Sequence, residues 1–331
     1  MTQKIIFRTL GGMRIGYGHY YRCISLASAC YKSFKRIEIT FIVNKELEEL
    51  IKETHFKYFI KDILDEDIEV IQKKGPDLFV FDSYLGNDHY LRKVKDLTKL
   101  MIFDDNNDIY DSTIPDILLN GNIYANHLNY KLNKNSLYLL GPKYLVLKEE
   151  YWETNKEIEV YKDGLLITTG GTDLHEISYI ILKNINELPI KKRVIIGPSY
   201  SSSLIKKIEE LNDTYLELIY KPKSLKDYIR TSKLVITASG STVYEVLTQK
   251  TMPLIFSMAK NQEIAYYYFE AHKIPVLGKY PNINYDIIQN KIKKIINDNE
   301  DLHWNKIYNY FKSDGVKQVI EAIQECIRGC D

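Results

Sequence analysis

Short apolar segments alternate with amphipathic segments along the whole chain. Segments such as 77–82 and 233–238 have apolar interiors without a polar face, as strands of a parallel sheet covered on both sides do. Segments such as 19–33 and 241–250 carry apolar residues at helical spacing. We therefore predict a doubly wound α/β fold, with strands at 4–8, 37–43, 77–82, 99–104, 116–120, 164–169, 193–197, 215–219, 233–238, 252–256 and 274–278.

A strand followed by a glycine turn and a helix occurs twice, at 4–32 and again at 164–187. The segment between them, 150–162, is charged and has no clear period, which is typical of a linker. We predict two Rossmann-like domains, 1–150 and 151–331, the second ending in packing helices. Two such domains facing one another across a cleft would bring the carboxyl ends of their strands to its mouth, where ligands bind in this architecture.

Charge and hydropathy exclude several classes of protein. Lys and Arg number 45 and Asp and Glu 44, so the net charge of +1 gives the whole chain no attraction to nucleic acid or to an anionic membrane. No apolar run reaches the roughly 20 residues of a membrane-spanning helix. The N-terminal apolar stretch is too short for a signal peptide, so we expect a cytoplasmic protein without a nucleic-acid partner.

Four cysteines are too few for a disulfide framework in a chain of 331 residues. Cys23, Cys30, Cys326 and Cys330 lie in predicted helices and have neither the spacing of a zinc site nor a histidine at ligand distance. We expect reduced structural thiols, no metal and no cofactor.

Glycines follow the first strand and lead to a helix that begins with His19 and continues through Arg22. Gly16 and Gly18 allow the backbone to approach a ligand closely, and the free N–H groups of a first helical turn favour negative charge. His19 at this position could act as a general base. The alternative is a turn that simply needs glycine, with a histidine that caps the helix.

Two further turns in the second half combine glycines, hydroxyl groups and a helix start. They contain Gly171 and Thr172 after strand 164–169, and Ser239, Gly240, Ser241 and Thr242 after strand 233–238. Such turns suit a diphosphate, and Glu245, one turn into the second helix, could accept both hydroxyls of a ribose. Helix capping by Ser and Thr could explain either turn without a ligand.

Polar residues also follow other predicted strands. Asn261 and Gln262 follow strand 252–256 and could bind a sugar or phosphate, or cap a helix. Asp82 ends strand 77–82 and Tyr84 follows it, and Asp105 follows the next strand. Carboxylates at adjacent strand ends could orient a histidine or bind sugar hydroxyls. A metal is disfavoured because three or more oxygen ligands are not evident.

In this order, the segments resemble the PseG family of UDP-2,4-diacetamido-2,4,6-trideoxy-β-L-altropyranose hydrolases and related spore-coat polysaccharide proteins. The matching stretches are Arg8, 15–23, 81–84, 103–105, 116–120, 141–144, 170–173, 238–245 and 261–262. The resemblance implies a GT-B-type fold whose second domain holds UDP. It also implies inverting hydrolysis of a UDP-linked, di-N-acetylated trideoxy sugar at C1, in pseudaminic-acid-type surface glycan biosynthesis.

The resemblance also implies roles for single residues. His19 matches the base that activates water and Tyr84 matches a tyrosine of the sugar site. The nucleotide-binding residues would be Gly171, Thr172, Ser239, Gly240, Ser241, Thr242 and Glu245, and the substrate-binding residues Arg8, Gly16, Gly18, Arg22, Asp82, Asn261 and Gln262. Leu10 and Lys148 depart from the family pattern, which commonly has an acidic residue and an arginine there. A GT-B glycosyltransferase with an alcohol acceptor and a nucleotide-sugar-binding protein without turnover are the alternatives.

Overall fold

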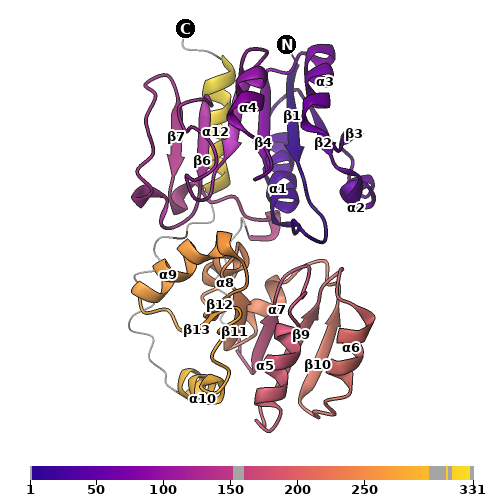
Figure 1. The fold of residues 1–331 in the computed structure, drawn as a ribbon, viewed down its shortest axis with the longest axis vertical. Helices are drawn as coiled ribbons and strands as arrows, with labels where there is room; N and C mark the ends of the chain where they lie inside the picture. Colours follow the sequence, from indigo (N-terminus) through magenta and orange to yellow (C-terminus); the bar gives the residue numbers. More distant parts are fainter. Residues whose placement is uncertain (1, 152–159, 298–310, 312–314, 329–331) are drawn as a thin grey trace. The chain divides into compact units, whose positions relative to one another are not determined.

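The chain forms two compact units, 1–152 with 312–331, and 153–311. The computed structural model describes residues 2–151, 160–297, 311 and 315–328. Each unit contains one parallel sheet with helices on its faces (Figure 1). The predicted α/β architecture with two sheets is therefore confirmed. The central part of the predicted linker, 152–159, lies outside the described residues.

The sheet of the first unit has the strand order β3-β2-β1-β4-β5-β6-β7, and all neighbouring strands are parallel. The order reverses between β1 and β4, and ligands bind beside such a reversal at the carboxyl ends of the strands. The strands are β1 (Gln3–Thr9), β2 (Ile37–Val43), β3 (Lys57–Ile60), β4 (Leu78–Asp82), β5 (Lys99–Phe103), β6 (Ile117–Asn120) and β7 (Leu137–Leu140).

Alternation along β1 assigns its side chains to two different layers of helices. Ile5 and Phe7 face the core that contains α1 (Gly18–Ser33), α2 (Glu48–Lys52) and α12 (Gly315–Arg328). Ile6 faces the opposite core, with α3 (Asp67–Lys74) and α4 (Asp88–Lys95). Because successive side chains of a strand point to opposite faces, Arg8 lies on the α3/α4 side.

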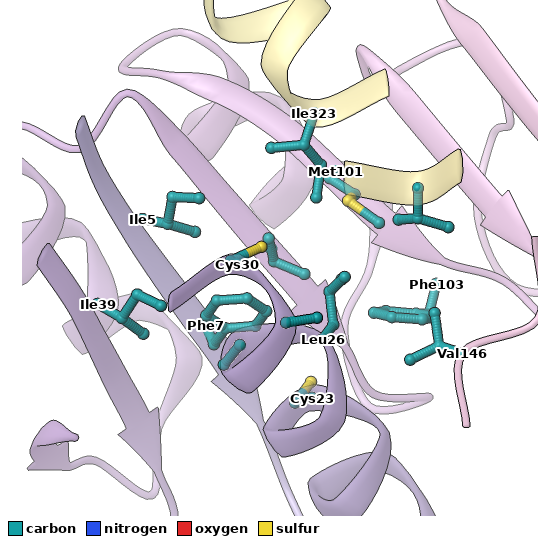
Figure 2. Close-up of a cluster of buried hydrophobic side chains, with 14 of the residues drawn as sticks. Ile5, Phe7, Cys23, Leu26, Cys30, Ile39, Met101, Phe103, Val146 and Ile323 are labelled. Atoms are coloured by element: carbon teal, nitrogen blue, oxygen red, sulfur yellow. The ribbon is translucent and has the colours of Figure 1, made fainter. Parts of the chain in front are cut away.

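The last helix belongs to the first unit, which corrects the prediction that 151–331 forms one domain. Val319 and Ile323 of α12 are fully buried in the core of the first sheet, and Ile323 lies beside Met101 of β5 (Figure 2). The sequence of α12 predicts a helix with one apolar face but does not indicate which core this face covers. Only the folded chain determines the sheet against which α12 packs.

The sheet of the second unit has the order β10-β9-β8-β11-β12-β13, again fully parallel, and it reverses between β8 and β11. Its strands are β8 (Leu165–Thr168), β9 (Lys192–Ile196), β10 (Leu216–Tyr220), β11 (Leu234–Ala238), β12 (Met252–Ser257) and β13 (Val276–Lys279). Its helices are α5 (Ile177–Ile185), α6 (Ser202–Glu209), α7 (Lys226–Arg230), α8 (Thr242–Thr248), α9 (Glu263–Ala271) and α10 (Ile288–Asn297). Residues of α5, α6 and α10 share one core with the sheet.

Among the described residues, no helix is both long and apolar enough to span a membrane. The same residues contain no cluster of three or more potential metal ligands. Cys23, Cys30 and Cys326 are free thiols, and Cys330 lies outside the described residues.

A buried ion pair fastens α3 to the first sheet. The Arg8 guanidinium donates to Asp67 at 2.8 Å, both side chains are completely buried, and the Tyr90 hydroxyl donates to the same carboxylate at 2.7 Å. Arg8 also donates to the carbonyl oxygens of Ile42 and Lys61. Because these contacts pair the buried charge and satisfy its N–H groups, the arginine can lie between the sheet and the α3/α4 helices.

Removing one partner of this pair is expected to destabilise the protein strongly. In Asp67→Ala the Arg8 charge stays buried without its carboxylate, so we expect the free energy of unfolding to fall by about 3–5 kcal/mol in urea denaturation. The neighbouring exposed Glu66→Ala is the control and should cost well under 1 kcal/mol. An Asp67→Ala variant as stable as this control would show that the pair contributes nothing.

Candidate active site

The loop between β1 and α1 is a small closed turn that determines where the helix begins. Gly12 and Gly16 exchange two backbone hydrogen bonds, and Gly16 has φ +84°, a conformation that favours glycine. The Asn44 side chain bonds both the N–H and the carbonyl of Gly11. Helix α1 consequently starts at Gly18, which puts His19 in its first turn.

His19 is buried and bonded to the aspartate at the end of β4. Its Nδ1 lies 2.6 Å from Oδ1 of Asp82, which is only 1% exposed. The two residues meet because β1 and β4 are neighbours at the reversal of strand order, with Thr9 opposite Asp82. An ionised carboxylate can only accept a hydrogen bond, so Nδ1 carries a proton and the free acceptor of the neutral form of this imidazole is Nε2.

Arg22 links this aspartate to the next strand end. Its Nε and Nη2 donate to the two oxygens of Asp82 at 2.9 and 2.8 Å, and its Nη1 and Nη2 donate to Asp105 at 2.7 and 3.0 Å. The guanidinium also lies 4.6 Å from the centre of the Phe103 ring. All three nitrogens are thus engaged with protein groups, and Arg22 and Asp82 support His19 in this structure. That the two residues also contact substrate stays a prediction.

The charges in this cluster stabilise one another. Burial alone would raise the pKa of the Asp82 carboxyl, but the Arg22 guanidinium and His19 outweigh it and the pKa is lowered. The pKa of Asp105 is lowered for the same reason, burial being outweighed mainly by Arg22. Both carboxylates are therefore ionised near neutral pH, as the assignment of the proton to Nδ1 of His19 requires.

Tyr84 and Asn122 complete the cluster. The Tyr84 hydroxyl donates to Oδ2 of Asp105 at 2.6 Å, and its ring meets the His19 ring edge to face at 4.5 Å. The Asn122 side chain donates to Oδ1 of Asp105 at 2.9 Å. Asn122 was not predicted. The rule that polar residues after parallel strands share one edge could have found it, because it follows β6 as Asp105 follows β5.

Arg8, predicted to bind substrate, is not brought to this cluster. It lies on the opposite face of the sheet from α1 and bonds Asp67 there. The two departures from the family pattern also have structural places: Leu10 is buried, and Lys148 Nζ lies 5.5 Å from the centre of the Tyr21 ring.

In the second unit the glycine pair lies in a loop and does not begin a helix, contrary to the prediction. The loop follows β8, and α5 begins only at Ile177, where the Asp173 carboxylate accepts from the N–H groups of Ile177 and Ser178. Asp173 is thus explained by helix capping. The loop packs closely against Gly197. A Cβ at this position would come within 2.7 Å of the carbonyl oxygens of Gly170 and Gly171, so the close contact requires glycine.

The segment after β11 differs from a simple helix cap. Ser241 occupies the N-cap position of α8 without a side-chain hydrogen bond to the helix backbone. Ser241 is exposed, Gly240 and Thr242 are half-buried, and Glu245 is buried in the first turn. Hydroxyl groups and a glycine therefore surround the start of this helix, beside the reversal of strand order between β8 and β11.

Gln262, predicted to bind a sugar or phosphate or to cap a helix, contacts this turn. The Ser239 hydroxyl donates to the carbonyl oxygen of Gln262, and the Gln262 side-chain oxygen accepts from the backbone N–H of Met258. Gln262 thus shapes the turn, whereas Asn261 is exposed. Both lie in a short 3₁₀ helix, Lys260–Gln262, between β12 and α9.

Comparison with known proteins adds two relatives by sequence, although no family model matches the chain. The UDP-2,4-diacetamido-2,4,6-trideoxy-β-L-altropyranose hydrolase of Campylobacter jejuni is 27% identical over 268 residues, which cover 78% of this chain and 93% of the relative. The chain is similar in sequence to the PseG hydrolases. An uncharacterized protein of Methanocaldococcus jannaschii, MJ1062, is 28% identical over 263 residues, 74% of this chain, and the match spans only 53% of that relative.

Solved structures show that the fold is of the GT-B type. The glycotransferase of kitacinnamycin superposes with a TM-score of 0.72 at 9% identity, covering 99% of this chain and all of the other. MurG of Acinetobacter baumannii gives 0.67 at 9% identity, covering 97% and 99%. At such low identity the likeness concerns the fold alone.

Proposed function

We propose that this protein hydrolyses a UDP-linked sugar at C1 and releases UDP and the free sugar. The observation that carries the proposal is His19, whose Nδ1–H bonds a buried, ionised aspartate so that Nε2 can accept a proton. Similarity to the Campylobacter hydrolase supports a di-N-acetylated trideoxy sugar as the substrate, in pseudaminic-acid-type glycan biosynthesis.

The reaction needs a deprotonated water more than it needs an acid. UDP is a good leaving group, because its diphosphate accepts the bonding electrons without first being protonated. His19 would take a proton from water as the water oxygen bonds C1 and the bond from C1 to the UDP oxygen breaks. One displacement from the face opposite UDP inverts C1 without a covalent intermediate.

The second unit is proposed to bind UDP. The loop with Gly171 and Thr172 and the turn from Ser239 to Thr242 flank the reversal of strand order, the usual ligand position in this architecture. Backbone N–H groups there could neutralise a diphosphate, and Glu245 could accept the ribose hydroxyls. Asn261, exposed at the next strand end, is proposed to contact the phosphate or the sugar.

The test is an incubation of the purified protein with UDP-2,4-diacetamido-2,4,6-trideoxy-β-L-altropyranose in H₂¹⁸O without an acceptor. We expect UDP and free sugar in equal amounts, unlabelled UDP because the C1–O bond breaks, and an inverted anomer in the first NMR spectra. UDP release only after an alcohol acceptor is added would favour glycosyl transfer, as in the kitacinnamycin glycotransferase, whose fold is similar. Binding without either reaction would favour a binding protein.

A further inference from the structure

Asp105 gathers groups from three other parts of the first unit. Its Oδ1 accepts from Arg22 Nη1 and Asn122 Nδ2, and its Oδ2 accepts from Arg22 Nη2 and the Tyr84 hydroxyl. Arg22 comes from α1, Tyr84 from the loop after β4 and Asn122 from the loop after β6. One carboxylate thereby connects three neighbouring loops and helices at the carboxyl edge of the sheet.

The carboxylate has no capacity left for a sugar hydroxyl. A carboxylate offers about four lone-pair positions, and the four hydrogen bonds to Asp105 occupy them. Its side chain is only 13% exposed. These contacts argue against direct binding of the sugar by Asp105, which was one of the functions considered for the carboxylates at the strand ends.

We propose that Asp105 is a positioning residue, which holds the Tyr84 ring against His19 and the Arg22 guanidinium against Asp82. This inference rests on the proposed function, because it concerns the geometry of the proposed base. The Tyr84 hydroxyl must donate its proton to the acceptor-only carboxylate, so this bond ties the phenol to Asp105. The ring then keeps its edge-to-face contact with the imidazole.

Asp105 also acts on His19 through the Arg22 guanidinium. Arg22 Nη2 donates to Asp82 and to Asp105 at the same time, so the two carboxylates hold the guanidinium along two adjacent edges, Nε–Nη2 and Nη1–Nη2. Nη2 also lies 3.4 Å from Nδ1 of His19, which is protonated and has no lone pair to accept with. A rotation of Arg22 would therefore change the surroundings of the His19–Asp82 hydrogen bond directly.

Asp105→Asn tests this arrangement without changing the size of the side chain. The new amide N–H₂ must replace one of the two oxygens, and either oxygen accepts from Arg22, so a donor meets a donor in both orientations. We expect kcat to fall about tenfold or more, since small misplacements of reacting groups are costly, with a much smaller change in KM. Asp105→Glu, which keeps the charge, should recover part of kcat. The exposed neighbour Asp108→Asn is the matched control and should behave as wild type.

Tyr84→Phe separates positioning from a general loss of stability. It removes only the hydroxyl that donates to Asp105, and if both residues act through one arrangement, Tyr84→Phe with Asp105→Asn should lose much less than the product of the single losses. A rise in KM with unchanged kcat in Asp105→Asn would overturn the inference, as would fully multiplicative losses.

A proton NMR measurement distinguishes failure of this inference from failure of the proposed function. The Nδ1–H of His19, bonded to Asp82, should give a downfield resonance that needs no substrate to observe. We expect Asp105→Asn to move or broaden it, and Asp108→Asn to leave it unchanged. An unchanged resonance in Asp105→Asn overturns the inference. If Asp105→Asn changes this resonance as expected but the wild-type protein hydrolyses no UDP-sugar, the proposed function alone is contradicted.

Discussion

Replacing His19 by alanine is expected to lower kcat for UDP-sugar hydrolysis by about 10²–10⁴-fold, the usual contribution of a general base. Without the imidazole, the Arg22 guanidinium that remains on Asp82 cannot accept the proton of the attacking water, because it has only donors. The affinity for UDP should not change, because the proposed nucleotide-binding residues belong to the second unit. Steady-state kinetics and calorimetric titration with UDP would measure the two effects.

The matched control for this substitution is His89→Ala, which removes an exposed histidine of α4. It should retain the kcat of the wild type. If His19→Ala hydrolyses the sugar at the wild-type rate, His19 is not the base. If it also loses UDP binding, the variant has been perturbed beyond the site, and folding must be compared by circular dichroism.

Asp82→Asn is expected to lower kcat by about 10²–10⁴-fold, as loss of the base itself would, because it removes the group that selects the histidine tautomer. Asp82 Oδ1 accepts from His19 and from Arg22 Nη2, while Oδ2 accepts from Arg22 Nε. An amide N–H₂ in the first position would face Nδ1 of His19 and favour a proton on Nε2, which could then not accept one. An amide N–H₂ in place of Oδ2 would face the Nε–H of Arg22, so two donors would meet.

The double variant His19→Ala with Asp82→Asn shows whether Asp82 acts through the histidine. Residues that act as a unit are strongly non-additive, so the double variant should be about as slow as His19→Ala alone. A further loss of the same size as in Asp82→Asn would mean that Asp82 contributes independently of His19. A stable fold in all three variants, measured by thermal denaturation, is the condition for this comparison.

Much of the fold follows from short-range patterns in the chain. Strands with continuous apolar interiors, such as 78–82 and 234–238, were predicted close to their observed bounds because burial on both faces leaves no room for polar residues. Strands β3 and β7 were not predicted. They lie at the two edges of the first sheet, are only partly buried and have four residues each. Apolar runs as short as YFI in β3 and LYLL in β7 do not by themselves indicate a strand.

Most residues of the candidate site could be predicted from the sequence, but the contacts between them could not. The strand-end rule indicated His19, Asp82, Tyr84 and Asp105, because parallel strands bring the residues after them to one edge, whereas the role of Arg22 was implied by the resemblance. It could not determine which of them bond one another, since that depends on side-chain directions in the folded sheet. Arg8 illustrates this limit, because its position one residue from Phe7 turns it to the other face.

The sequence by itself determined two α/β units, their parallel strands and the polar turns at the strand ends, because each depends on residues close together in the chain. Only the tertiary structure decided that α12 covers the first sheet, that Arg8 pairs with Asp67, and that Asp105 saturates its oxygens with Arg22, Tyr84 and Asn122. These contacts join residues far apart in the chain. An apolar helix face or a polar side chain could pair with several partners at similar energy, and the order of strands in the folded sheet decides which of these partners is its neighbour.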